Sequence, residues 1–163
     1  MLLSLTLLLS APVLAEPERI QLHQRQDVQT DHQRMVGNVR AQAQREGVVV
    51  QVPQLFAYLS DYAAAFHMSG HRSGFERELN LVVQRSRKAR STVRLDRLLE
   101  RVITPEGAEF GLEDLPSADV YLVLYRRAAC ETCDQVDEIV GEWLDDHPDI
   151  KAVRLDVSLD LPS

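Results

Sequence analysis

Residues 120–133 of the 163-residue chain read VYLVLYRRAACETC, an apolar run followed by two arginines and the only two cysteines of the sequence. Residues 120–125 are apolar at odd and even positions alike, which is typical of a central strand covered on both faces. The acidic amphipathic segment that follows, to about Asp146, predicts a helix. The Cys-x-x-Cys pair therefore lies at the step from a strand into a helix, where free N–H groups and the helix dipole stabilise a thiolate.

Residues 1–15 carry no charge and end in Ala-Pro-Val-Leu-Ala, a small-x-small site before Glu16. This apolar stretch is too short to span a bilayer and predicts a secretory signal peptide. No Lys or Arg precedes the stretch, so a start other than Met1, or retention of the segment as an anchor, stays open. We expect a protein that is exported, either to the periplasm or as a secreted chain.

The net charge of −7 is distributed unevenly along the chain. Residues 16–103 carry 14 Lys/Arg against 10 Asp/Glu, whereas residues 104–163 carry 4 against 15. Oppositely charged halves are compatible with packing against each other. The basic cluster from Arg85 to Arg101 has no aromatic residues interleaved with it, so a solvated helix face is favoured over a nucleic-acid site.

The sequence divides into a signal peptide and four further segments. After residues 1–15 we expect an N-terminal helix in residues 16–47, a Val-Pro hairpin and helix in 48–88, a connector in 89–117, and the Cys-x-x-Cys βαβ half in 118–163. The N-terminal helix is predicted over residues 18–46 because apolar side chains recur at three- and four-residue steps. Within the connector, a second short helix is expected from about Thr92 to Ile103.

The hairpin segment is expected to begin with a strand just after Pro53, because proline cannot donate to a strand ladder. A second strand over Tyr62 to Met68 and a helix from Ser73 follow. In the last segment, Ile150 to Val157 is predicted to form a strand with Val153, Leu155 and Val157 on one side.

Residues 118–157, an apolar strand, Cys-x-x-Cys, a helix and a strand, resemble the first half of the thioredoxin superfamily. The elements around Val52-Pro53 resemble the second half of such a domain, although they come earlier in the chain. The resemblance implies an α/β thioredoxin-like sandwich with a central mixed sheet, in circularly permuted or split element order. Permutation costs little where the joined ends lie close together on the surface. Completion of two half-domains by a second chain, as a swapped homodimer, and a chance upstream match both stay open.

The resemblance also implies roles for individual residues. Pro53 would be a cis-proline facing the dithiol, with Val52 as the neighbour that pairs with a bound substrate chain. Cys130 would be the attacking thiolate and Cys133 the resolving thiol. Arg126 and Arg127 are expected to lower the pKa of Cys130, while Glu131 opposes that effect. Ala129 and the Glu-Thr centre depart from the family's usual aromatic-Cys-Gly-Pro-Cys, so the direction of electron flow is open.

Two alternatives for the cysteines are a disulfide that only pins the helix end and a zinc site shared with His67 and His71. The zinc site would need histidines before cysteines, unlike the usual spacing. The sequence thus predicts an exported thiol–disulfide oxidoreductase without a cofactor or metal, acting on exported clients with cysteines or on a redox partner. The alternative is a non-enzymatic docking or assembly protein of an envelope or conjugative transfer apparatus.

Overall fold

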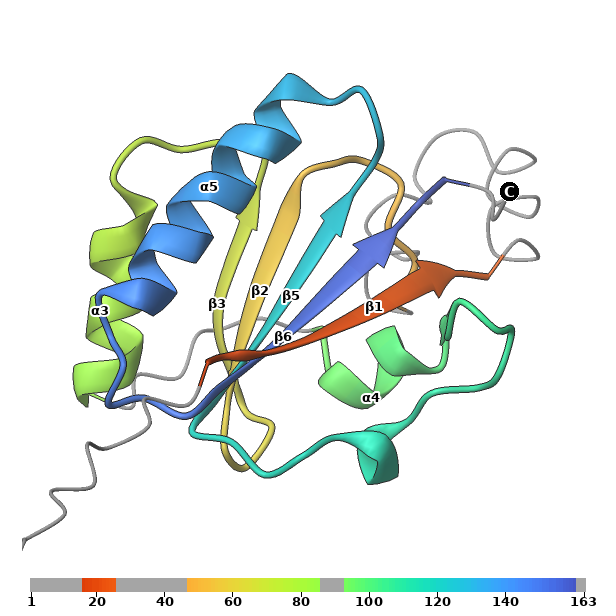
Figure 1. Cartoon of the computed structure of the whole chain (residues 1–163), viewed down its shortest axis with the longest axis horizontal. Coiled ribbons are helices and arrows are strands. Elements are labelled where there is room, and N and C mark those ends of the chain that lie inside the picture. Colours follow the sequence, from red (N-terminus) through yellow and green to blue (C-terminus); the bar gives the residue numbers. More distant parts are fainter. Residues whose placement is uncertain (1–15, 26–46, 86–92, 161–163) are drawn as a thin grey trace, which may run out of the picture.

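A computed structural model of the chain describes residues 16–25, 47–85 and 93–160. These residues form a mixed α/β structure built on one six-stranded sheet (Figure 1). The strands are β1 (Glu18–Gln24), β2 (Gln54–Leu59), β3 (Ala64–Ser69), β4 (Val102–Ile103), β5 (Val120–Arg126) and β6 (Ala152–Ser158). The helices are α3 (Phe75–Arg85), α4 (Leu95–Leu99) and α5 (Glu131–Asp145), with a 3-10 turn at Leu112–Asp114.

The sheet has the order β3-β2-β5-β6-β1-β4, so β5 and β6 lie at its centre. Strand β5 pairs antiparallel with β2 and parallel with β6. Every residue from Val120 to Tyr125 is buried, which confirms the prediction of a strand covered on both faces. The hairpin of β2 and β3 and the strand–helix–strand unit β5-α5-β6 therefore share one sheet within a single chain.

Helices α3 and α5 lie on one face of the sheet, and α4 lies on the other (Figure 1). The first face packs Leu55 and Leu122 of the sheet against Phe75 of α3 and Val136 of α5. The second face packs α4 and the segment around Val49 against the other side of the same strands. Two apolar cores, one on each face, hold the layers together through burial of apolar surface.

Several predicted elements are confirmed. Strand β2 begins at Gln54, directly after Pro53, and its hairpin partner β3 ends at Ser69, one residue beyond the prediction. Helix α5 follows the cysteines, and Val153, Leu155 and Val157 of β6 share one core, as their alternation indicated.

The N-terminal helix predicted over residues 18–46 is wrong at its start. Residues Glu18–Gln24 are strand β1, which pairs parallel with β6 and antiparallel with β4. Leu22 and Gln24 are buried and alternate with more exposed neighbours, so the segment follows the two-residue period of a strand. The remainder of that prediction, residues 26–46, lies outside the described residues.

The short helix predicted to Ile103 is also corrected. Helix α4 spans only Leu95–Leu99, and Val102 and Ile103 leave it to pair with β1 as strand β4. The pairing satisfies backbone groups on the outer side of β1. In the described part of the chain, no helix has the length and the apolar character needed to cross a bilayer.

Candidate functional site

The two cysteines form a disulfide at the start of α5, with their Cα atoms 5.2 Å apart. Cys130 is the N-cap of the helix, and its Sγ accepts a hydrogen bond from the Cys133 N–H at 3.2 Å. Cys133 is completely buried, whereas Cys130 is partly exposed. Cys130 is therefore the member of the pair that lies nearer to solvent.

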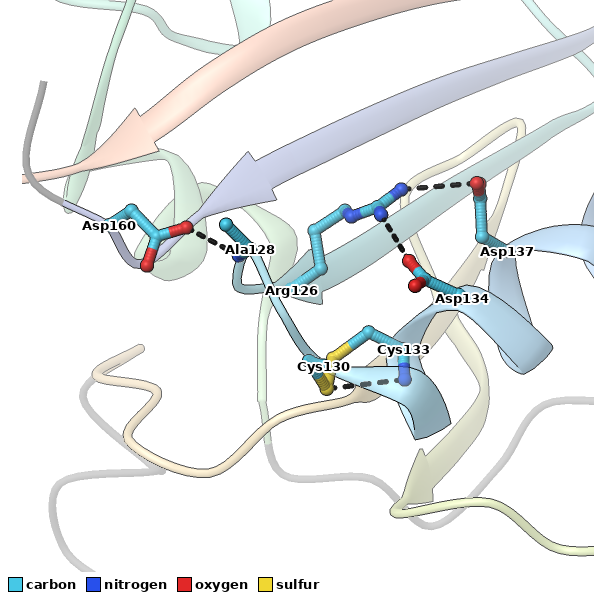
Figure 2. The surroundings of a disulfide bond; sticks show 7 residues. All are labelled: Arg126, Ala128, Cys130, Cys133, Asp134, Asp137 and Asp160. Atoms are coloured by element: carbon cyan, nitrogen blue, oxygen red, sulfur yellow. Dashed lines mark hydrogen bonds and ion pairs between the residues drawn. A yellow bond between two sulfur atoms is a disulfide. The ribbon is translucent and has the colours of Figure 1, made fainter. Parts of the chain in front are cut away.

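A short exposed loop, Arg127–Ala129, joins the end of β5 to Cys130. Ala129 has a φ of 50°, in the left-handed region that an alanine seldom adopts. The Ala128 N–H donates to a carboxylate oxygen of Asp160 at 2.6 Å (Figure 2). The loop is thus held by a residue that follows β6, far away in the sequence.

Arg126 occupies the last position of β5, and Figure 2 shows its guanidinium directed toward Asp134 and Asp137 of α5. It forms ion pairs with Asp134 at 2.8 Å and with Asp137 at 3.1 Å. The predicted influence of Arg126 on Cys130 is therefore opposed by two carboxylates that share its charge. Arg127 and Glu131, the other two residues predicted to tune the cysteine, are exposed at the loop–helix junction.

Val52 and Pro53 immediately precede β2, at the end of the sheet where β5 leads to Cys130. The Val52–Pro53 peptide bond is cis, as the resemblance implied, and Pro53 is buried. The next residue, Gln54, lies opposite Tyr125 in the sheet register. Since β5 ends one residue after Tyr125, the start of β2 and the loop leading to Cys130 lie at one edge of the sheet, the upper edge in Figure 1. The structure therefore brings the predicted site residues to one end of the fold.

A group of buried charges lies on the α5 side of β6, and the sequence analysis missed it. Arg154 and Asp156 are 4% and 1% exposed, and the Arg154 guanidinium donates to Asp156 at 2.7 Å. Arg154 also pairs with Asp137 of α5, and Arg19 of β1 pairs with Asp156. The sequence does contain an indication of this group, because Arg154 and Asp156 lie two residues apart, and so on one face, in a mostly apolar strand.

Asp137 connects these buried charges to the start of α5. Burial on its own would raise the pKa of the Asp137 carboxyl. The hydrogen bond and charge of Arg154, with the charges of Arg126 and Arg19, outweigh burial and lower that pKa below the ordinary value of 3.8. The carboxylate therefore stays ionised and helps to fix α5 against β5 and β6.

The histidines considered for zinc serve other contacts. His67 of β3 hydrogen-bonds Gln54 at 2.7 Å and stacks on Phe56 with ring centroids 4.4 Å apart. Burial lowers the pKa of His67, which favours the neutral ring. His71 meets the edge of Phe75. Among the residues that the structure describes, no group of three or more His, Cys, Asp or Glu side chains is arranged to hold a metal ion.

Neither the protein-family models, nor the curated protein sequences, nor the solved structures contain a match to this chain.

Proposed function

We propose that the protein is a thiol–disulfide exchange protein of thioredoxin-like architecture in which the element order is permuted. The observation that carries the proposal is the disulfide at the first turn of α5, with Cys130 accessible and Cys133 buried. The strand order β3-β2-β5-β6, with β2 antiparallel to β5 and β6 parallel to it, also supports it. Pairing of β2 with β5 inside one chain favours permutation over completion of the sheet by a second chain.

The exchange begins from the disulfide. A thiolate of a client dithiol attacks the Cys130 Sγ, a new client–Cys130 disulfide forms, and the bond to Cys133 breaks with its electron pair on the Cys133 sulfur, which takes up a proton. The second client thiolate then attacks the client sulfur of the mixed disulfide and releases Cys130. The client has lost two electrons and now contains a disulfide, and the protein holds two thiols. The same steps in reverse reduce a client disulfide.

The local structure favours Cys130 as the leaving and attacking sulfur. Its sulfur accepts the Cys133 N–H, and the amide groups of the first helical turn place partial positive charge beside it. Both interactions stabilise a thiolate over a thiol. Cys133, by contrast, is buried, and in the proposed exchange it resolves the mixed disulfide within the molecule.

The proposal is tested by reduction of insulin with dithiothreitol as the electron donor. The wild-type protein is expected to accelerate the reaction above the rate with dithiothreitol alone, and Cys130→Ala is expected to abolish the acceleration. Cys133→Ala is the matched control, because it keeps the attacking sulfur and should accumulate a covalent insulin adduct detectable by mass spectrometry. A wild-type protein without any acceleration would contradict the proposal.

A non-enzymatic docking or assembly role is the second candidate. It is favoured by the pairing of Arg126 with Asp134 and Asp137, which opposes the positive field expected at Cys130. If the Cys130 thiol titrates at or above about 8.5, the value of a free cysteine, and insulin reduction is absent, this candidate takes precedence.

We propose export on the sequence of residues 1–15, which lie outside the described part of the chain. In an oxidising compartment the Cys130–Cys133 disulfide would persist, and clients would be exported proteins with cysteines.

A further inference from the structure

The residues that follow β6 hold the loop that leads to Cys130. The Leu159 N–H donates to the Arg126 carbonyl at 3.0 Å, which continues the β5–β6 pairing past the last strand residue. The Asp160 carboxylate then accepts the Ala128 N–H at 2.6 Å. The Asp160 N–H in turn donates to the Ser158 hydroxyl at 3.1 Å, which holds the Asp160 backbone against the end of β6.

This contact acts on a short loop that contains a left-handed residue. Only Arg127, Ala128 and Ala129 separate β5 from the helix cap, and Ala129 holds a φ of 50°. A left-handed alanine persists only where its surroundings hold it in place. If the Ala128 N–H were released to water, Ala129 would relax and the Cys130 Sγ would move relative to the amide groups of the first helical turn.

We propose that Asp160 is a positioning residue for disulfide exchange, because its carboxylate fixes the loop that places the Cys130 sulfur at the start of α5. The inference rests on the proposed function of the cysteine pair. Asp160 acts on Cys130 in two ways: its hydrogen bond sets the position of the loop, and its negative charge opposes a thiolate. Asp160→Asn removes the charge but keeps an acceptor oxygen, whereas Asp160→Ala removes both.

Asp119 provides a matched control at the opposite end of the same two strands. Its carboxylate accepts the Lys151 N–H at 2.8 Å, just before β5 and β6 begin. Asp119→Ala therefore removes the same kind of carboxylate–amide hydrogen bond, but far from the cysteines.

The experiment measures the equilibrium constant between each full-length variant and glutathione, with the pH dependence of Cys130 alkylation in the reduced protein. We expect Asp160→Ala and Asp160→Asn to differ in the equilibrium constant by about three- to tenfold, and Asp119→Ala to match the wild type. Exchange of the Ala128 amide hydrogen should accelerate in Asp160→Ala and stay slow in Asp160→Asn. Equal values for the two Asp160 variants, or an equal effect of Asp119→Ala, would overturn the proposal.

These measurements separate the two proposals. The glutathione equilibrium and the alkylation profile need only the cysteine pair, so they are obtained whether or not insulin is reduced. If insulin is not reduced but the two Asp160 variants still differ in the glutathione equilibrium constant as expected, only the proposed enzymatic function is contradicted.

Discussion

Asp137 is the residue at which the buried charges of the sheet meet the first turns of α5. Three guanidinium groups, those of Arg19, Arg126 and Arg154, lie within ion-pair distance of its carboxylate. A buried charge is tolerated where it is paired, and removal of one partner leaves the others uncompensated. The effect of Asp137 on stability is therefore tied to its ionisation.

We expect Asp137→Asn to lower the free energy of unfolding by about 2 kcal/mol at neutral pH. The pKa of Asp137 is lowered in the folded protein, so the native state binds fewer protons than the unfolded state between the folded pKa and 3.8. The stabilisation is complete above the unfolded value and is lost as the pH falls through the folded pKa. Urea unfolding from about pH 6 down to about pH 2 measures it, with the difference between wild type and variant shrinking at the acid end.

Asp134→Asn is the control, because Asp134 shares Arg126 but is 65% exposed at its side chain. Its effect is expected to stay below about 0.5 kcal/mol at neutral pH. A variant difference for Asp137 that is independent of pH would contradict the ionic explanation.

At the residue scale, the cysteine pair was predicted from the sequence and the cis Val52–Pro53 bond from the resemblance, but the carboxylates around the cysteines were not predicted. Cys130 and Cys133 are recognisable as a motif because they lie three residues apart, about one turn of a helix. Asp160 and Asp137 carry no local pattern of their own. Their contacts join residues 32 and 17 positions apart in the sequence, and only the fold shows such pairs.

At the element scale, β2, β3, β5 and β6 were predicted from apolar alternation or continuous apolar runs, and β1 and β4 were not. The sequence of β1, Glu18–Gln24, offers only Ile20 and Leu22 as apolar residues, and a single pair at a two-residue step is too short a pattern to identify a strand. Its strand conformation is decided by pairing with β6 on one side and β4 on the other. Strand preference depends on such neighbours more than on the segment itself.

Gly47 packs closely against the backbone of helix α4. It has a φ of +81°, and a Cβ built there would overlap the carbonyl oxygen of Arg97 in α4. We expect Gly47→Ala to cost at least about 2 kcal/mol of unfolding free energy, from the left-handed backbone and the overlap together. Thermal and urea unfolding measure the change.

Gly107→Ala is the matched control, since Gly107 has a φ of +88° but open space around its Cβ position. It should show the backbone cost alone, about 1 kcal/mol. Equal effects at the two glycines would show that the contact with Arg97 adds nothing.

At the scale of the whole molecule, we expect the same sheet to form when its elements are connected in a different sequence order. Strands β6 and β1 are parallel neighbours with Glu18 opposite Val153, so the end of β6 and the start of β1 lie at opposite edges of the sheet. Seven strand residues separate those edges, or about 23 Å. A flexible linker of about 16 residues spans that distance.

We expect a chain that begins at Ala118, joins Asp160 to Glu16 through such a linker and ends at Ser117 to fold and form the Cys130–Cys133 disulfide. Its free energy of unfolding should lie within about 3 kcal/mol of the natural order, because the added loop closure costs little. Circular dichroism and mass spectrometry check the fold and the disulfide.

A second rearranged chain, opened between Leu122 and Val123, is the control. It divides the central strand β5, whose residues are buried, and we expect it not to fold. If both rearranged chains fold, or if neither folds, the expectation drawn from the strand pairing is wrong.

The direction of β1 determines which way the protein would face if it were tethered. Its first residues lie beside the beginning of β6, while the sulfur pair lies beyond the end of β5, which runs parallel to β6. An attachment through the residues before Glu16 would therefore leave from the opposite pole of the molecule. Held in that way at a bilayer surface, the molecule would present Cys130 outward, toward passing chains, with the length of the strands between the sulfur and its anchorage.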